Sequence, residues 1–337
     1  MIKKTLLIIG SLAVSGLIAL SACKSNNAAV FSNSNQSALK NQLQSSISSN
    51  VKHGSLWNSE LFNDSRFMLD IKLSKAEKKE AKKLARSFEP HMKSSTLFMH
   101  YLLSELKKRN LPLELAALPL LESGFNPRAK SHAGAHGPWQ FIRSTGKTYG
   151  LERSSNYDEF YDFIESTDAS LKFLQHLYNA CSKNWYLAIA AYNQGEFAVK
   201  KAISRAKKSG VPAEKISINN VKLSRYAYVY VKRFKAYADI LRNPETYGVK
   251  RPEIENRPAF RRVAIAGRIN SMKKAAELSG VGIKTLQHLN AGYLSDSLKS
   301  NKQRGLLVPI DHASKLEDAL GVQDNTTLDA QNLSFNR

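Results

Sequence analysis

Helical periodicity constrains this fold more than any other sequence feature, because it runs through most of the chain. Between residues 70 and 245 apolar residues recur at helical spacing, and no run of alternating apolar and polar residues predicts a strand. Ser74 and Glu77 stand at the spacing of a capping box, which favours a helix start. Further helices are expected at 95–109, 111–122, 139–149, 166–182, 185–195, 196–208 and 224–242. The sequence therefore predicts an all-α domain.

Local signals add detail to two of these helices. Pro119 should kink the last turn of the helix that ends at Glu122, because a proline inside a helix removes a backbone hydrogen bond. Ser166 or Thr167 is expected to cap the helix that continues to Ser182, since short hydroxyl side chains favour the first helical boundary position.

Composition limits the partners. The 337 residues, 42% of them hydrophobic, are enough for one large or two modest domains with a true core. A formal net charge of +22 and a sequence pI near 9.9 favour an anionic partner, such as a nucleic acid, a membrane surface or an acidic polymer. Lys and Arg are spread along the chain, so charge alone does not choose among these partners.

The N-terminus predicts export. Two lysines precede an apolar run at 6–20, and small residues follow it, which is typical of a signal peptide over residues 1–22. The run is shorter than the roughly 20 residues of a stable membrane span. The sequence at 20–23 resembles the bacterial lipobox, so Cys23 is expected to carry a lipid anchor, and the following Lys24 favours the outer membrane, facing the periplasm. An ordinary signal peptide with an incidental cysteine is the alternative.

Polar or proline-rich segments separate the expected domains. Residues 23–55 are rich in Ser, Asn and Gln and indicate a flexible tether. Three prolines mark a linker at 246–258, and residues 321–337 read as a disordered tail. Cys181 lies on an apolar helix face, which predicts a buried thiol rather than a reactive one.

The stretch 118–141 carries the best candidate for catalysis. An apolar helix ends in Glu122, and a loop of small residues follows. An enzyme that cleaves a glycosidic bond needs a carboxyl group that stays protonated near neutral pH, so that it can protonate the leaving oxygen. The C-terminal end of a helix disfavours negative charge, and the apolar neighbours of Glu122 favour the neutral acid. A surface carboxylate at a helix end is the alternative.

Two longer motifs strengthen the first interpretation. Glu122-Ser123-x-Phe125, followed by the small residues up to Gly137-x-Trp139-Gln140-Phe141, is the first motif, and Ala-x-Ala-Ala-Tyr-Asn-Gln-Gly at 188–195 is the second. Together they resemble the signature of lysozyme-like lytic transglycosylases, glycoside hydrolase family 23. The resemblance covers about residues 95–242 and implies a lysozyme-like helical domain over 56–245.

The resemblance also implies a reaction and a site. Relatives cleave the β-1,4 bond between N-acetylmuramic acid and N-acetylglucosamine in peptidoglycan, and the muramyl 6-hydroxyl closes a 1,6-anhydro ring without water. A single Glu acts as acid and then as base, which assigns Glu122. The residues expected to bind the glycan are Ser123, Ser131, Gln140, Tyr192, Asn193 and Tyr230. Tyr192 is a candidate to hydrogen-bond Glu122 or the muramyl group, and Trp139 is expected in the core.

The same motifs imply no cofactor. His132 and His136 lack the spacing of metal ligands, so no metal site is expected. Relatives carry Glu and Thr where this chain has Tyr226 and Ala227, which questions its efficiency and saccharide specificity. A murein-binding lipoprotein with weak catalysis is therefore one alternative.

A hydrolase is a second alternative, because water-using glycosidases need a second carboxylate. The acids that follow the motif are expected at surface and capping positions: Asp158, Glu159, Asp162, Glu165 and Asp168.

A small C-terminal α/β unit is expected at 259–320. Residues 272–290 suggest two helices joined by a turn, and 305–309 a short strand, in the rhythm of a degenerate LysM module. Binding to glycan and a purely structural role are both open for this unit. The helix pair also resembles a DNA-binding helix-turn-helix, but an exported protein meets no genome, so no nucleic-acid partner is expected.

Overall fold

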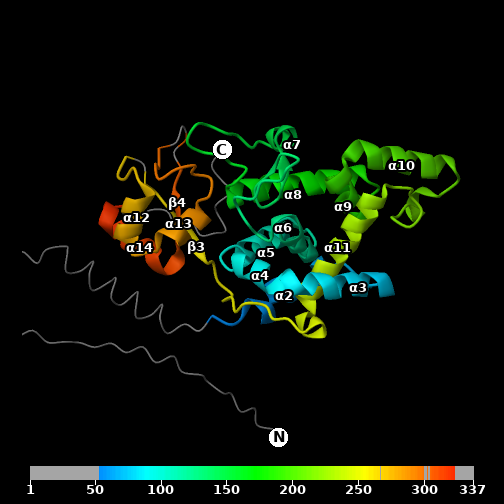
Figure 1. Ribbon diagram of the computed structural model, residues 1–337, viewed down its shortest axis with the longest axis horizontal. Coiled ribbons are helices and arrows are strands. Elements are labelled where there is room, and N and C mark those ends of the chain that lie inside the picture. Colours follow the sequence, from blue (N-terminus) through cyan, green and yellow to red (C-terminus); the bar gives the residue numbers. More distant parts are fainter. Residues whose placement is uncertain (1–52, 266, 300–301, 303, 323–337) are drawn as a thin grey trace, which may run out of the picture. The chain divides into compact units, whose positions relative to one another are not determined.

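The structure is a computed structural model that describes residues 53–265, 267–299, 302 and 304–322 (Figure 1). The expected signal peptide, Cys23, most of the expected tether and most of the expected tail lie outside these residues. No helix of the described part is long and apolar enough to cross a membrane.

Helices build the first part of the described chain, as the sequence predicted (Figure 1). The α-helices are α2 (Glu60–Asn63), α3 (Lys75–Leu84), α4 (Phe88–Ser95), α5 (Met99–Lys108), α6 (Ala117–Ser123), α7 (Arg143–Thr148), α8 (Phe163–Ala180), α9 (Trp185–Gln194), α10 (Glu196–Lys208) and α11 (Arg225–Arg242). Short 3-10 turns lie at Leu56–Asn58, Ser65–Phe67, Ala85–Ser87, Leu113–Ala116, Ala213–Lys215 and Pro244–Tyr247. The long α11 packs against α3, α9 and α6, so it connects the two motif segments.

Capping side chains fix several helix starts. Ser74 and Glu77 form both hydrogen bonds of the expected capping box at α3. Ser224 accepts a hydrogen bond from the backbone N–H of Ala227 and starts α11. The cap of α8 is Asp162, which accepts from two backbone N–H groups, so the expected cap at Ser166 or Thr167 was wrong. Both of those residues lie within the helix, where their short side chains are buried.

The segments on either side of the loop differ from the prediction. The expected helix from 139 begins only at Arg143, because Phe141–Ile142 (β2) pairs antiparallel with Ala135–His136 (β1). Upstream, residues 113–116 form a 3-10 turn before α6, so Pro119 lies in the first turn of a short helix. It therefore does not kink the last turn of a longer helix, and a proline is tolerated in a first turn.

The C-terminal unit contains the expected strand and helix pair. It consists of β3 (Phe260–Val263), α12 (Met272–Ser279), α13 (Ile283–Leu289), β4 (Leu306–Pro309) and α14 (Ile310–Leu320). β3 and β4 pair antiparallel, with Phe260 opposite Pro309. The sequence had not indicated β3 or α14 as elements, and α14 packs on β3 and α12.

The C-terminal unit shares its core with the helical domain. Phe260, Leu289 and Leu307 join the helical core, and Tyr157 of the helical domain joins the core of the C-terminal unit. The expected linker is also packed, since Ile254 is buried and the Trp57 indole N–H donates to the carbonyl of Pro252 at 2.7 Å. The described residues therefore form one continuous packed body.

Two side chains lie where the sequence predicted. Trp139 is fully buried, and its indole N–H donates to the hydroxyl of Thr167 at 2.9 Å. Cys181 is also fully buried, and burial raises the pKa of its thiol to about 11. A thiol with so high a pKa carries almost no thiolate at neutral pH, so it is chemically inert.

Candidate active site

Glu122 lies in the last turn of α6, and the glycine after that helix fixes where the chain leaves it. Gly124 caps α6 in the left-handed conformation, with φ of 61°. A Cβ atom at this position would lie 2.6 Å from the ring of His91 on α4. Both the backbone angle and the close ring therefore require glycine here. The buried Phe125 that follows anchors the start of the loop.

Opposing effects determine the pKa of the Glu122 carboxyl group. Burial, the largest, raises its pKa from 4.5 to about 7, although part of the side chain stays exposed. The hydroxyl of Tyr230 donates a hydrogen bond to this carboxyl, which lowers its pKa. The positive charge of Arg233 lowers it further. Because burial prevails, a large fraction of Glu122 is protonated at neutral pH.

Tyr230 is the tyrosine that contacts Glu122. It lies on α11, is buried, and keeps its proton because burial and the nearby carboxyl raise its pKa well above 10. Tyr192, on α9, instead donates to the backbone carbonyl of Trp139 at 2.8 Å and lies 3.1 Å from the hydroxyl of Ser170. Tyr192 thus joins α9 to the loop and to α8 rather than bonding Glu122.

Three candidate glycan-binding residues hold the backbone of the loop. The hydroxyl of Ser123 donates to the carbonyl of Pro138 at 2.8 Å, and Ser131 accepts from the backbone N–H of Ala135 at 3.0 Å. The amide of Gln140 donates to the carbonyl of Gly137 at 2.8 Å. All three side chains are partly exposed, so they keep surface that a ligand can reach. Asn193 is exposed near the end of α9.

A second segment, residues 152–161, packs against this loop. Gly137 approaches it so closely that a Cβ atom would lie 1.7 Å from the carbonyl oxygen of Phe160. Arg143 binds both carboxylate oxygens of Asp158, at 2.7 and 2.5 Å. The ring of His136 lies 2.9 Å from the hydroxyl of Tyr161. The conformation of the loop therefore depends on this neighbouring segment.

The later acids are not the surface residues that the sequence suggested. Asp158, Glu159 and Asp162 are buried, and each has a partner of its own. Glu159 binds Arg304 and Lys302 of the C-terminal unit, while Asp162 caps α8 and accepts a hydrogen bond from Tyr157. The surface assignment was wrong for these three acids because each is buried with a partner, and for Glu159 the partners lie more than 140 residues away. The capping role was right for Asp162.

The remaining two acids differ in charge state. Burial, together with the charge of Asp162, raises the pKa of Glu165 to about 7. Asp168 binds Arg109 at 2.9 Å and Lys172 at 2.7 Å, and these cations lower its pKa. None of the five acids is among the described groups that shift the pKa of Glu122.

The C-terminal unit binds both segments of the site. Arg128, in the loop, donates to the backbone carbonyl of Tyr293 at 2.7 Å. The backbone N–H of Asp158 donates to the carbonyl of Gly292 at 2.8 Å. The rings of Tyr157 and Tyr293 pack edge to face, with their centroids 4.8 Å apart. The sequence gave no sign of these pairings.

Arg233, whose charge acts on Glu122, was also missed. Its spacing of three residues from Tyr230 puts both on one face of α11, and this spacing could have identified it.

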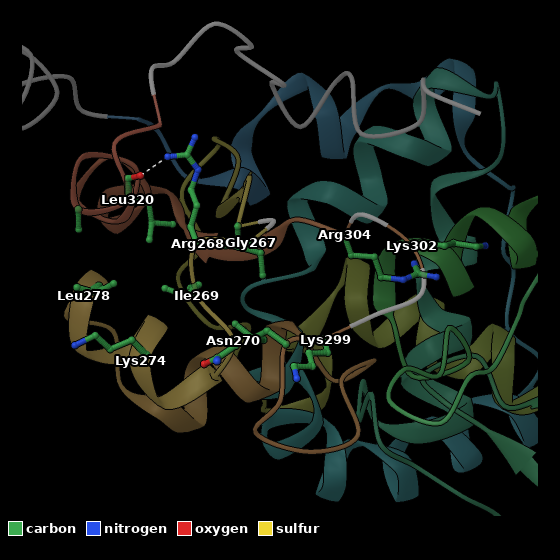
Figure 2. A pocket seen from close by; sticks show the side chains of 13 residues that line it. Gly267, Arg268, Ile269, Asn270, Lys274, Leu278, Lys299, Lys302, Arg304 and Leu320 are labelled. Atoms are coloured by element: carbon green, nitrogen blue, oxygen red, sulfur yellow. Dashed lines mark hydrogen bonds between the residues drawn. The ribbon is translucent and has the colours of Figure 1, made fainter.

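A pocket of about 880 Å³ lies in the C-terminal unit (Figure 2), and Glu122 is not among its lining residues. Its described lining includes five cationic side chains and no acidic one. Some of these cations are already engaged, because Arg268 donates to the carbonyl of Leu320 and Arg304 binds Glu159. The lining residues come only from the C-terminal unit: Ile265, Gly267, Arg268, Ile269, Asn270, Lys274, Leu278, Leu298, Lys299, Lys302, Arg304, Ala319 and Leu320.

Metal chemistry has no counterpart in the described part of the chain. Within it, no three His, Cys, Asp or Glu side chains gather closely enough to hold a metal ion. His136, in the loop, lies beside Tyr161 and packs against Phe160.

Comparisons with known proteins divide the chain as the structure does. Residues 102–213 match the family model described as Transglycosylase SLT domain. Residues 259–324 match the model described as Lytic transglycosylase MltD, LysM-like domain. The first match includes the loop, Glu122 and Tyr192, and the second includes the whole C-terminal unit.

Two similar proteins carry different kinds of name, and one of these names agrees with the family matches. Membrane-bound lytic murein transglycosylase D of Escherichia coli (strain K12) is 36% identical over 245 residues, which cover 69% of this chain and 53% of that protein. A protein of Alteromonas sp. (strain M-1) named for tributyltin chloride resistance is 44% identical over 115 residues, 34% of this chain and 56% of that protein. The chain thus spans about half the length of the curated relatives it matches.

Among solved structures, lytic transglycosylase Slt from Pseudomonas aeruginosa matches 44% of this chain and 24% of that chain. The identity is 18% and the TM-score is 0.33, too low for the two folds to be compared in detail.

Proposed function

We propose that this chain, whose helical domain belongs to the transglycosylase SLT family and whose C-terminal unit is a LysM-like domain of the MltD type, is a peptidoglycan lytic transglycosylase. It acts on the β-1,4 bond between N-acetylmuramic acid and N-acetylglucosamine. The products carry 1,6-anhydro-N-acetylmuramic acid ends. Its role is the remodelling of the cell wall.

The reaction uses Glu122 twice. The protonated carboxyl gives its proton to the glycosidic oxygen, so the bond from that oxygen to the muramyl C1 breaks. The resulting carboxylate then takes the proton of the muramyl 6-hydroxyl while that oxygen bonds to C1 and closes the anhydro ring. Glu122 regains its proton, and no water is consumed. A pKa of about 7 suits both steps, because a group that acts first as an acid and then as a base works best when its pKa lies near the working pH.

The observation that supports this proposal most is that Glu122 has a raised pKa and that no other carboxylate is among the described groups that shift it. Within the described residues, Tyr230 and Arg233 lower the pKa of Glu122, and no carboxylate is found among the groups that shift it. A hydrolase with two carboxylates would need a second acid within about 10 Å. Four of the acids that follow the motif, Asp158, Glu159, Asp162 and Asp168, are bound to other partners. This set of groups around Glu122 supports a single acid that becomes the base.

Mass spectrometry of digested peptidoglycan sacculi tests the proposal. Wild type should release fragments with anhydro ends, and Glu122→Gln should release none, because the amide cannot donate or accept the proton. Glu214→Gln, which removes an exposed carboxyl group, is the matched control and should keep the activity. Reducing ends as the main product would favour a hydrolase on this fold. Undiminished cleavage by Glu122→Gln would refute the assignment of Glu122.

We also propose that the protein is an exported lipoprotein of the outer membrane, anchored through Cys23 and facing the periplasm. The charged start, the apolar run at 6–20 and the lipobox-like residues before Cys23 support this proposal. The name of the Escherichia coli relative describes that protein as membrane-bound. Cys23→Ser should release the protein from the membrane fraction, whereas retention of the variant there would refute lipid anchoring.

A further inference from the structure

Two strongly exposed aromatic side chains lie on α10 and α11, the helices that follow the second motif. Tyr226 is 83% exposed and Phe197 is 80% exposed, the two highest values among the large apolar residues described. Scattered surface aromatics are ordinary, but neighbouring exposed rings that continue a binding site are typical of an interaction surface. The position of each ring relative to Glu122 decides between these interpretations.

Tyr226 lies on the face of α11 that acts on Glu122. Residues four and seven positions apart share one helix face, so Tyr226, Tyr230 and Arg233 form one stripe. Tyr230 donates its hydrogen bond to Glu122, and the charge of Arg233 lowers the pKa of the same carboxyl. Tyr226 precedes Tyr230 by one turn, a rise of about 6 Å. It therefore extends the stripe from the catalytic carboxyl toward the beginning of the helix.

Phe197 belongs to a segment tied to the beginning of α11. The hydroxyl of Ser224, the cap of α11, donates to the side-chain carbonyl of Gln194 at 2.7 Å. Phe197 follows Gln194 by three residues, and Tyr226 follows Ser224 by two. One side-chain hydrogen bond thus links the segment before Phe197 to the segment before Tyr226.

We propose that Tyr226 and Phe197 form a stacking platform for a sugar ring of the glycan strand, next to the glycosidic bond whose oxygen Glu122 protonates. The apolar face of an N-acetylhexosamine ring matches the flat face of a tyrosine or phenylalanine, and burying both faces stabilises the complex. This platform rests on the proposed function, because it places the same glycan on the same site.

Binding of chitotetraose, a chain of four N-acetylglucosamine units, to the full chain tests the platform. The background is Glu122→Gln, which prevents turnover, and calorimetry measures Kd. Tyr226→Ala and Phe197→Ala should each weaken binding about 5- to 10-fold, the range expected for loss of one aromatic contact. Tyr226→Phe, which keeps the ring, should restore affinity to within about twofold of the background protein. Circular dichroism checks that every variant is folded.

Tyr228→Ala is the matched control, because residues two positions apart do not share a helix face. Tyr228 lies on the same helix and is 40% exposed, and its hydroxyl donates to the carbonyl of Val221. It should bind chitotetraose as the background protein does. Unchanged affinity of Tyr226→Ala, or an equal loss in Tyr228→Ala, would overturn the platform.

Turnover separates this inference from the proposed function. With Glu122 intact and sacculi as substrate, Tyr226→Ala should raise KM by the same factor, because a contact kept in both the ground state and the transition state does not change kcat. If kcat falls instead and KM is unchanged, Tyr226 is no platform. If wild type forms no anhydro ends while Tyr226→Ala still weakens chitotetraose binding, the platform stands and the proposed reaction fails.

Discussion

Replacing Glu122 by Gln is expected to stabilise the protein, and to do so more strongly at alkaline pH. Burial raises the pKa of Glu122 from 4.5 to about 7, so the folded chain holds this proton more tightly than the unfolded chain. The free energy of unfolding of the wild type therefore falls as the pH rises from about 4.5 to about 7, and this contribution stays constant at higher pH. The amide of the variant does not titrate, so the free energy of unfolding of the variant does not fall for this reason.

The magnitude follows from the pKa. A rise from 4.5 to about 7 corresponds to about 3 kcal/mol, at about 1.36 kcal/mol for each pH unit. Most of it, about 2.5 kcal/mol, should emerge between pH 5 and pH 8. Urea unfolding of both proteins at pH 5, 6, 7 and 8 gives the free energies of unfolding. The difference between variant and wild type should increase with pH and level off above pH 7.

A constant difference across this pH range would refute the reasoning, because Glu122 would then titrate like an exposed carboxyl group. A difference that shrinks as the pH rises would mean that its pKa is lowered. Glu214→Gln controls for the loss of one negative charge in a very basic protein. The same titration should limit catalysis, so kcat/KM of the wild type should fall as the pH passes about 7.

Three further substitutions test the surroundings of Glu122. Tyr230→Phe removes a hydrogen bond that lowers the pKa of Glu122, so the alkaline limit of kcat/KM should move to higher pH in a pH–rate profile. Arg304→Ala leaves Glu159 buried with one cation fewer, which should lower the free energy of unfolding in urea by about 3 kcal/mol. Gly137→Ala combines a left-handed φ with a steric clash, and urea unfolding should show a loss of about 3 kcal/mol or more.

A matched variant isolates the cause of the loss at Gly137. Gly134 has the same φ of 79° as Gly137 but open space around a Cβ atom, so Gly134→Ala should lose only about 1 kcal/mol. Equal losses at the two glycines would exclude the clash. For Arg304, a variant as stable as wild type would mean that Lys302 alone neutralises Glu159. For Tyr230, an unchanged alkaline limit would show that its hydrogen bond does not act on Glu122.

Short-range chemistry explains what the sequence could predict. The capping box of Ser74 and the helix start at Ser224 involve groups within three residues, so their patterns are complete in the local sequence. The position of Glu122 at the end of an apolar helix is equally local, and it was enough to suggest a desolvated acid. Asp162 immediately precedes α8 and could have been chosen as the cap over Ser166 by its place alone.

Long-range pairing explains what the sequence could not predict. Tyr230 lies 108 residues from Glu122, and Arg304 lies 145 residues from Glu159. Acids are almost always exposed unless they are paired. A sequence that does not reveal the distant partner therefore predicts a surface position for a buried acid. Residues 135–142 were read as loop and helix start, because a pair of two-residue strands is too short to show alternation.

Long-range contacts also indicate a structural role for the C-terminal unit. Two family models, at 102–213 and 259–324, describe it as a separate module. In the structure its Tyr293 carbonyl binds Arg128 of the loop that follows Glu122, and its Gly292 carbonyl binds the backbone of Asp158. Asp158 in turn holds Arg143, at the start of α7 directly after β2. Loosening the C-terminal unit would therefore free the loop that follows Glu122, so a structural role for this unit needs no bound glycan.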